Sequence, residues 1–149
     1  MATLEFKMQD AEAKKIMENL IQGLSDFTPA LKDTSKYEMK QIDEAFKVAG
    51  KNITGEPWAK LSPDYLKAKM KAGFLTNILV RTGKMRESFK QIALTKNNLK
   101  ITNVGTDYFK YHQVGTSKMP QRQMLGYSQA MITQIMKIVG DYILSLLKK

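Results

Sequence analysis

The sequence between residues 91 and 104 reads QIALTKNNLKITNV, and this stretch decides the predicted fold. Apolar and polar residues alternate on both sides of Asn97-Asn98, as they do in a strand with one buried face. Asparagine tolerates the positive φ that a tight two-residue turn requires. The pattern therefore predicts an antiparallel hairpin with arms at 91–96 and 99–104 and its turn at Asn97-Asn98.

Helical patterns surround this hairpin. Ser62-Pro63 is typical of a helix start, because serine caps the first turn and proline lacks only an N–H that would stay unpaired. Thr28-Pro29 has the same form, and Thr82 is expected to cap a short helix. The patterns predict helices at 10–24, 28–48, 63–71, 82–89 and 128–147, a loop at 51–60, and a short strand at 4–8.

This order of elements predicts the α+β class. A small antiparallel sheet, made of the N-terminal strand and the hairpin, is expected to be packed by several helices, with a long helix at the C-terminus. The length of 149 residues suits a single domain, 1–149, with a sizeable core. We divide it into a helical first part at 1–50, a motif-bearing part at 58–126 and the C-terminal helix at about 128–147.

The composition excludes several classes of protein. Cysteine is absent, which excludes a disulfide scaffold, a thiolate metal site and a cysteine nucleophile. The apolar runs fall far short of the ~20 residues that cross a bilayer. Residues 1–8 lack the apolar core of a signal peptide. We therefore expect no membrane partner.

Positive charge is concentrated after residue 50. The chain carries 24 Lys+Arg and 14 Asp+Glu, a net charge of +10, and the balance is −2 over 1–50, +8 over 51–100 and +4 over 101–149. Such an excess attracts nucleic acid, a membrane surface or an acidic protein, or serves solubility alone. Because only three of the cations are arginines, sequence-specific reading of nucleic acid is disfavoured.

The sequence has little equipment for catalysis. Its one histidine, His112, would need a nucleophile and an orienting carboxylate, or further metal ligands, and only five acidic residues follow residue 50. The glycine turns at 82–84, 104–106 and 114–118 do not match a phosphate-binding loop. We expect no catalytic residue, no metal site and no cofactor, and a structural role for His112.

Four segments are more specific than the composition. They are WAKLSPDY at 58–65, ILVRTGKMRESF at 78–89, YHQVGT at 111–116 and MPQRQMLG at 119–126. In this order and spacing they resemble the phage virion morphogenesis, or tail completion, family of tailed phages and Mu-like prophages. That family shows W-x-x-L-S, L-x-x-T-G-x-L/M-R-x-S, Y-x-x-x-H-Q-x-G and P-x-R-x-x-L-G. One departure is Gln123-Met124, which stands where the family often has an aromatic residue after Pro-x-Arg.

The resemblance implies a non-enzymatic protein that acts late in virion assembly. It implies a homo-oligomeric ring at the head–tail junction or the upper end of the tail, in contact with phage head–tail or tail proteins. Such a protein works in the host bacterial cytoplasm during assembly and resides in the neck or tail end of the virion. As interface or structural motif candidates we single out Trp58, Arg81, Thr82, Gly83, Arg86, Tyr111, His112, Gln113, Gly115, Pro120 and Arg122.

Each candidate has two interpretations. Aromatic residues, methionine and arginine are enriched in interface cores, which favours contact with neighbouring subunits. A helix cap, a glycine turn or a buried Tyr/His hydrogen bond would instead hold the fold. Two other functions also stay open: a basic nucleic-acid-binding module that uses residues 51–100, with non-specific DNA contact inside a ring as a mixed form, and a small enzyme built around His112.

Overall fold

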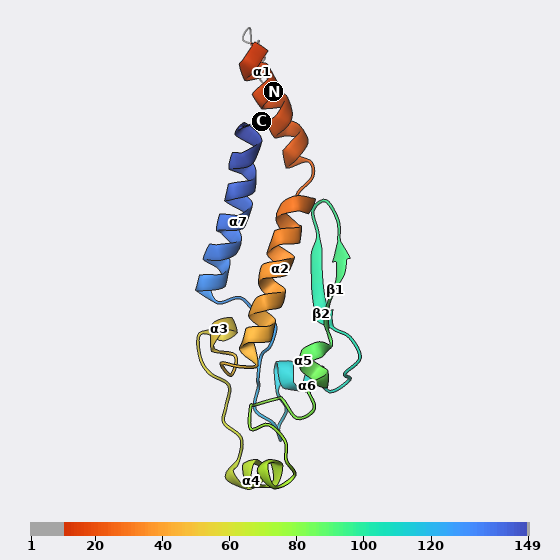
Figure 1. Ribbon diagram of the computed structural model, residues 1–149, viewed down its shortest axis with the longest axis vertical. Helices are drawn as coiled ribbons and strands as arrows, with labels where there is room; N and C mark the ends of the chain where they lie inside the picture. Colours follow the sequence, from red (N-terminus) through yellow and green to blue (C-terminus); the bar gives the residue numbers. More distant parts are fainter. Residues whose placement is uncertain (1–10, 149) are drawn as a thin grey trace.

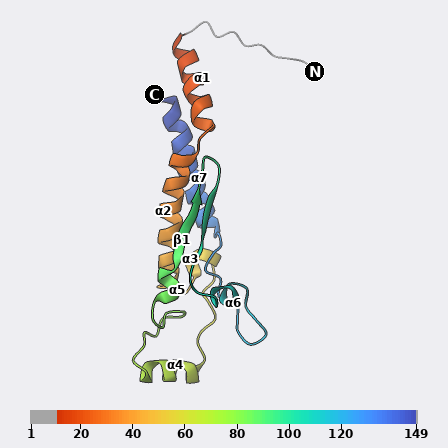
Figure 2. The same ribbon diagram turned by 90° about the vertical axis from the view of Figure 1, so that its right-hand side faces the viewer.

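Helix α2 (Thr28–Ala45) forms the axis of the structure, with α7 (Gln129–Leu147) packed along one side and a β-hairpin along the other (Figure 1, Figure 2). The hairpin consists of β1 (Phe89–Leu94) and β2 (Leu99–Asn103), paired antiparallel. This computed structural model describes residues 11–148. Within that range the predicted α+β class is confirmed, since seven helices accompany one two-stranded sheet.

The remaining helices lie toward the two ends of α2. Helix α1 (Ala11–Leu24) lies beside the C-terminal part of α7 at one end (Figure 1). The other end holds α3 (Lys51–Thr54), α4 (Pro63–Lys71), α5 (Lys84–Glu87) and α6 (Phe109–Val114). The strand expected at residues 4–8 lies outside the described residues.

The hairpin forms where the sequence predicts, but its turn lies one residue earlier. Leu94 pairs with Leu99, and the N–H of Thr95 donates to the carbonyl of Asn98 at 2.8 Å. The turn therefore centres on residues 96–97. Neither asparagine adopts the positive φ that we expected.

A tertiary contact accounts for this register. The carbonyl of Lys96 accepts a hydrogen bond of 2.8 Å from the N–H of Phe27, immediately before α2. The pairing then skips from Ala93 to Gln91, so that Ile92 forms a β-bulge. The tip of the hairpin is thus placed by the α1–α2 junction, which local turn preferences do not reveal.

Two predicted helix starts are confirmed and one differs. Ser62 accepts a hydrogen bond from the N–H of Tyr65, and Ser128 accepts one from Met131, both at 3.3 Å. At the start of α2 the acceptor is the carboxylate of Asp26, which lies 2.9 Å from the Thr28 N–H. The predicted cap at Thr28 is therefore wrong, although Pro29 occupies the first turn as expected.

Two further local predictions are wrong for a shared reason. Gly83, not Thr82, occupies the N-cap position of α5, and no side chain caps that helix. Part of the expected loop at 51–60 is helical, because Gly50 starts the one-turn helix α3. Gly50 and Gly83 both have positive φ, at 74° and 83°. In each place a glycine in the left-handed conformation changes the direction of the chain and starts a helix. A pattern of polar residues does not reveal this conformation.

A row of aromatic rings forms the centre of the core. Phe46 packs edge-on against Trp58 with ring centroids 5.7 Å apart, and Phe89 lies 6.1 Å from Phe46 on its other side. Phe109 continues the row, 5.5 Å from Phe89. Pairs of this kind stabilise by about 0.5–1.5 kcal/mol beyond their area burial. The row joins α2, the segment before α4, β1 and α6 into one cluster.

Trp58 also explains the glycine at position 50. A Cβ at Gly50 would lie 2.0 Å from Trp58 Nε1, and its φ of 74° is unfavourable for other residues. We expect Gly50→Ala to lower the free energy of unfolding by about 3 kcal/mol, because backbone strain and overpacking add.

Gly55→Ala is the matched control for this substitution. Its φ is 86°, but nothing lies within 4 Å of the added Cβ, so only the backbone cost of about 1 kcal/mol is expected. Urea unfolding followed by circular dichroism measures both variants. Equal losses would contradict the clash with Trp58.

Candidate functional site

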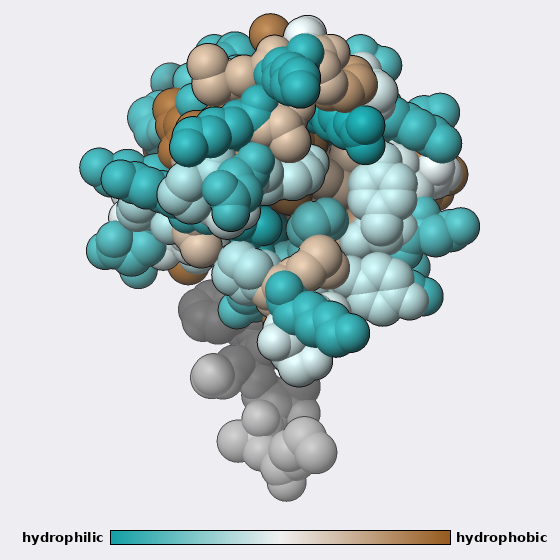
Figure 3. Space-filling view, turned by 90° about the horizontal axis from the view of Figure 1, so that it is seen from below, coloured by the Kyte–Doolittle hydropathy of each residue, from teal (hydrophilic) through white to brown (hydrophobic). Residues whose placement is uncertain are grey.

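A cavity of about 820 Å³ lies at the end of the molecule that carries α4. Residues 60–69, 79–85, 108–112 and 118–122 bound it, so each of the four sequence motifs contributes to its wall. Figure 3 looks onto this end and shows a surface made largely of hydrophilic side chains. The structure thus brings together residues as far apart in the sequence as Lys60 and Arg122.

The wall of the cavity is cationic and partly apolar. Its positive residues are Lys60, Lys69, Arg81, Lys84, Lys118 and Arg122. Its apolar and aromatic residues are Leu61, Leu79, Met85, Met119, Pro120, Tyr65 and Tyr108. No aspartate or glutamate is among the described residues that line it. No acidic residue of the described wall therefore balances its positive charge.

A strained turn presents the residues 81–83 to the cavity. Leu79 adopts a φ of 62°, which is unusual for a residue other than glycine, and Gly83 adopts 83°. The guanidinium of Arg81 lies over the ring of Phe74, 4.6 Å from its centroid. Thr82 lines the cavity together with Arg81 and Gly83, and does not cap a helix.

His112 lies in α6 at the inner part of the wall. Its carbonyl accepts a hydrogen bond of 2.8 Å from the N–H of Arg122. Its Nδ1 is buried and has no hydrogen-bond partner in the described part of the chain. Burial lowers the pKa of His112, and the positive charge of Arg122 lowers it further. The imidazole is therefore neutral at pH 7.

Two cations of the wall are buried and bonded only to carbonyl groups. Arg122, 7% exposed, donates from Nε to the carbonyl of Ala59 at 3.0 Å and from a terminal nitrogen to that of Lys60 at 3.3 Å. Lys69, 5% exposed, donates to the carbonyl of Asn77 at 2.6 Å. Burial lowers the pKa of Lys69, and the charge of Arg81 adds to this. Neither cation has a carboxylate partner among residues 11–148.

Gln113, Trp58 and Gly115 hold the wall together. The side-chain oxygen of Gln113 accepts from the N–H groups of Met124 and Leu125 at 2.9 and 3.1 Å, and its nitrogen donates to the Leu125 carbonyl at 2.7 Å. Trp58 Nε1 donates to the carbonyl of the neighbouring Gln123 at 2.8 Å.

Gly115 permits a close approach between two loops. A Cβ there would lie 2.9 Å from the backbone nitrogen of Gln121. The φ of 76° at Gly115 is also in the region that favours glycine. Gly115 therefore supports the return of the chain that brings Pro120 and Arg122 to the cavity.

Five sequence-selected residues do not line the cavity: Trp58, Gln113 and Gly115 support its wall, and Arg86 and Tyr111 lie elsewhere. Arg86 forms a two-pronged ion pair with Asp43 of α2, at 2.6 and 2.9 Å, and this hydrogen bonding lowers the pKa of Asp43. Tyr111 is exposed, and the ammonium of Lys110 lies 5.1 Å from its ring centroid. Neither side chain lines the cavity, although Arg86 lines a neighbouring hollow together with Arg81, Thr82 and Gly83.

Sequence reasoning missed three cavity residues that lie outside the four motifs: Lys69, Tyr108 and Lys118. Lys69 and Tyr65 of the first motif both come from α4, whose start at Ser62 was predicted but whose position was not. They stand four positions apart and so share a face of this helix. The spacing was a usable signal, but only knowledge of what α4 faces would have distinguished Lys69 from the exposed lysines beside it.

The described residues of the cavity wall offer charge and apolar surface to a ligand. The Nδ1 atom of His112 has no hydrogen-bond partner, and no carboxylate lines the cavity, within the described part of the chain. No group of three or more His, Cys, Asp or Glu residues suited to a metal ion occurs within residues 11–148. Clustered cations beside apolar walls favour an anionic group attached to apolar structure.

A model of the phage virion morphogenesis family matches residues 8–144. The chain belongs to this family. The match includes the helices before residue 50, which the four motifs do not cover. The Mu-like prophage FluMu G protein 1 of Haemophilus influenzae (strain ATCC 51907 / DSM 11121 / KW20 / Rd) is 29% identical over 103 residues, 68% of this chain and 70% of that protein. No solved structure gives a significant match.

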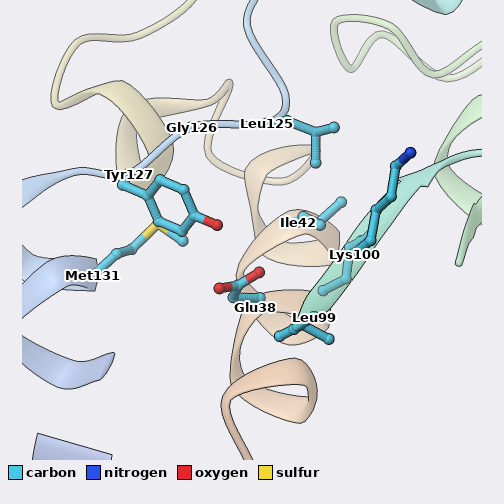
Figure 4. A pocket seen from close by; sticks show the side chains of 9 residues that line it. Glu38, Ile42, Leu99, Lys100, Leu125, Gly126, Tyr127 and Met131 are labelled. Atoms are coloured by element: carbon cyan, nitrogen blue, oxygen red, sulfur yellow. The ribbon is translucent and has the colours of Figure 1, made fainter. Parts of the chain in front are cut away.

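A second, smaller hollow of about 290 Å³ lies between α2, β2 and the segment before α7 (Figure 4). Glu38 projects into it from α2, and the hydroxyl of Tyr127 points toward the Glu38 carboxylate (Figure 4). Burial raises the pKa of Glu38, while a hydrogen bond with Tyr127 acts in the opposite direction. This site holds one half-buried acid close to the protein's axis.

Removal of the Gln113 amide should weaken the wall. Gln113→Ala leaves the part-buried backbone N–H groups of Met124 and Leu125 without their acceptor, while the Leu125 carbonyl keeps its bond from Gln123, so we expect a loss of about 2 kcal/mol in the free energy of unfolding. Gln121→Ala, which removes one exposed hydrogen bond to the Gln113 carbonyl, is expected to cost less than ~0.5 kcal/mol. Chemical denaturation measures the free energy of unfolding of both variants. Equal losses in this free energy would refute the bridging role of Gln113.

Glu38 predicts a pH dependence of stability with a definite sign. Because the folded-state pKa lies above the ordinary value of 4.5, the folded protein retains a proton that the unfolded chain has released. Stability should therefore fall as pH rises from 4.5 through the folded-state pKa. Glu38→Gln should remove this fall and be more stable than wild type at pH 7.

Tyr127→Phe provides the opposite test of Glu38. It removes the hydrogen bond that lowers the pKa of Glu38, so the fall in stability should extend to higher pH. Thermal unfolding between pH 4 and 8 measures all three proteins. A parallel pH dependence of wild type and Glu38→Gln would contradict the assignment.

Proposed function

We propose that this protein is a non-enzymatic virion assembly protein that acts in tail completion or head–tail joining as an oligomeric ring. The observation that carries the proposal is the shared cavity, to which all four motifs of the chain contribute. Its partners are then phage head–tail or tail proteins. Its place is the host bacterial cytoplasm during assembly and the neck or tail end of the finished virion.

Membership of the family supports the coarser part of this function. The family acts in phage virion morphogenesis, and the relative from Haemophilus influenzae bears the name of a Mu-like prophage protein. Binding rather than catalysis agrees with the chemistry of the cavity wall. The location in the virion and the oligomeric ring go beyond family membership and are the more specific parts of the proposal.

Exposed apolar faces on α1 and α7 support self-association. Helix α1 has no buried residue, and one of its faces carries Met17, Ile21 and Leu24. A matching stripe on α7 carries Ile132, Met136, Leu144 and Leu147. Exposed apolar faces of this kind mark surfaces that a partner covers. We propose that this partner is another copy of the chain.

Helix α7 is also long and apolar enough to cross a membrane by length and composition, and 11% of its apolar segment is buried. Lys137 and Asp141 form an ion pair of 2.7 Å in the middle of the helix. Charges at the centre of a span are costly in a bilayer. This favours a protein partner for the stripe, and the absence of a membrane partner stays a prediction.

The experiment compares two identical changes at different exposed sites. Ile21→Lys places a charge on the α1 face, where the side chain is 64% exposed, and Ile92→Lys places one at the β-bulge, where it is 49% exposed. We expect Ile21→Lys to abolish the oligomer in light scattering coupled to size exclusion, and Ile92→Lys to preserve it.

Infection supplies the functional readout of the same experiment. A phage that lacks the gene should produce heads and tails that do not join, and Ile92→Lys should restore joining while Ile21→Lys does not. Normal particles without the gene would overturn the assembly function. Restoration by Ile21→Lys would overturn the oligomer.

A nucleic-acid-binding module is the second candidate, and the charge of +8 over residues 51–100 favours it. It differs from the first by its salt dependence. Neutralising several phosphates makes DNA affinity fall steeply with salt concentration. Absence of DNA binding at ~50 mM salt would exclude this module and leave the assembly function untouched.

A further inference from the structure

The wall of the cationic cavity carries positive charge without a counter-charge, which an anionic ligand would supply. Six cations line it without an aspartate or glutamate, and none of the six takes part in an ion pair within residues 11–148. Arg122 and Lys69 are more than nine-tenths buried. Cations this deeply buried are rarely left without a counter-charge, because their desolvation is costly.

Hydrogen-bond donors remain available in the same wall. Arg122 has five N–H donors and uses those of Nε and one terminal nitrogen on backbone carbonyls. Lys69 has three donors and uses one, on the carbonyl of Asn77. An incoming group rich in acceptor oxygens would satisfy these positions together.

The size and the apolar part of the wall select among anionic ligands. A cavity of about 820 Å³ is in the range that encloses several side chains, and it does not admit a double helix. Leu61, Met85 and Met119 offer apolar surface that a phosphate backbone does not use. A peptide that alternates carboxylates with apolar side chains uses both the charged and the apolar parts.

From this geometry we infer that the cavity binds an acidic, apolar peptide segment of another virion protein. The carboxylates of that segment pair with Arg122, Lys69 and the rim cations, and its apolar side chains pack on Leu61, Met85 and Met119. This inference rests on the proposed function, because it supplies the chemistry by which an assembly protein holds an unlike partner.

The test uses a labelled peptide of sequence LEFDLEFD and the intact protein. Fluorescence anisotropy at ~150 mM salt, where surface attraction is screened, should show saturable binding below ~1 mM. The peptide LQFNLQFN, which has the same apolar residues without charge, should bind at least tenfold more weakly. Absence of saturable binding by the acidic peptide overturns the inference.

Two charge-matched double variants locate the site. Arg81→Gln with Lys118→Gln removes two exposed rim cations, and Lys32→Gln with Lys90→Gln removes two exposed cations elsewhere. The rim pair should weaken peptide binding tenfold or more, and the distant pair by less than twofold. Equal losses would show that net charge alone attracts the peptide, and would overturn the site.

Further measurements distinguish the peptide from other anionic ligands. They also distinguish failure of this inference from failure of the proposed function. Saturation by inorganic phosphate or by a 20-base-pair duplex, with the acidic peptide unbound, would replace the peptide by a phosphate ligand. If the peptide fails while the oligomer forms and tails join, the cavity inference falls alone. If the peptide binds at the rim but tails join without the gene, the proposed function falls alone.

Discussion

The contact between residues 58–60 and 122–123 is the constraint on which the rest of the structure depends. Trp58 donates to the Gln123 carbonyl, and Arg122 donates to the Ala59 and Lys60 carbonyls, so two distant segments are bonded in both directions. The same contact buries Trp58 against Phe46 in the core. The core and the cavity wall are therefore two sides of one interaction.

The motif residues had two possible roles, holding the fold or contacting a partner, and their bonds around this contact distinguish the two. The side chains of Trp58 and Gln113 form their hydrogen bonds with backbone groups of residues 123–125, so their contribution is to hold the loops. Arg81 and Pro120 have no such bonds and face the cavity. Arg122 does both, because its guanidinium fixes two carbonyls and still brings an unpaired charge to the wall. A buried charge held in this way is poor for stability alone and well suited to binding.

Local patterns predicted the parts of the fold that local chemistry determines. The α+β class, the hairpin and the caps at Ser62 and Ser128 are confirmed, because alternation and capping act within a few residues. The turn of the hairpin was misplaced, because its position depends on the Phe27 N–H, about 70 residues away. The burial of Lys69 was not predicted for the same reason. Motif order showed which segments matter, but only the fold shows that they surround one cavity.

Helix α1 and the cavity lie at opposite ends of an elongated structure, and α7 runs from its middle to the α1 end (Figure 1). The apolar faces and the cavity differ in chemistry. The α1 and α7 faces are apolar and therefore suit contact with identical copies, since apolar faces need no complementary charge. The cavity is cationic and therefore discriminates, since identical copies would repel one another there. If the apolar faces bind copies and the cavity binds an unlike partner, as proposed, the two associations use separate contacts. The proposed contacts can then be lost independently of one another, because no residue of the apolar faces lines the cavity.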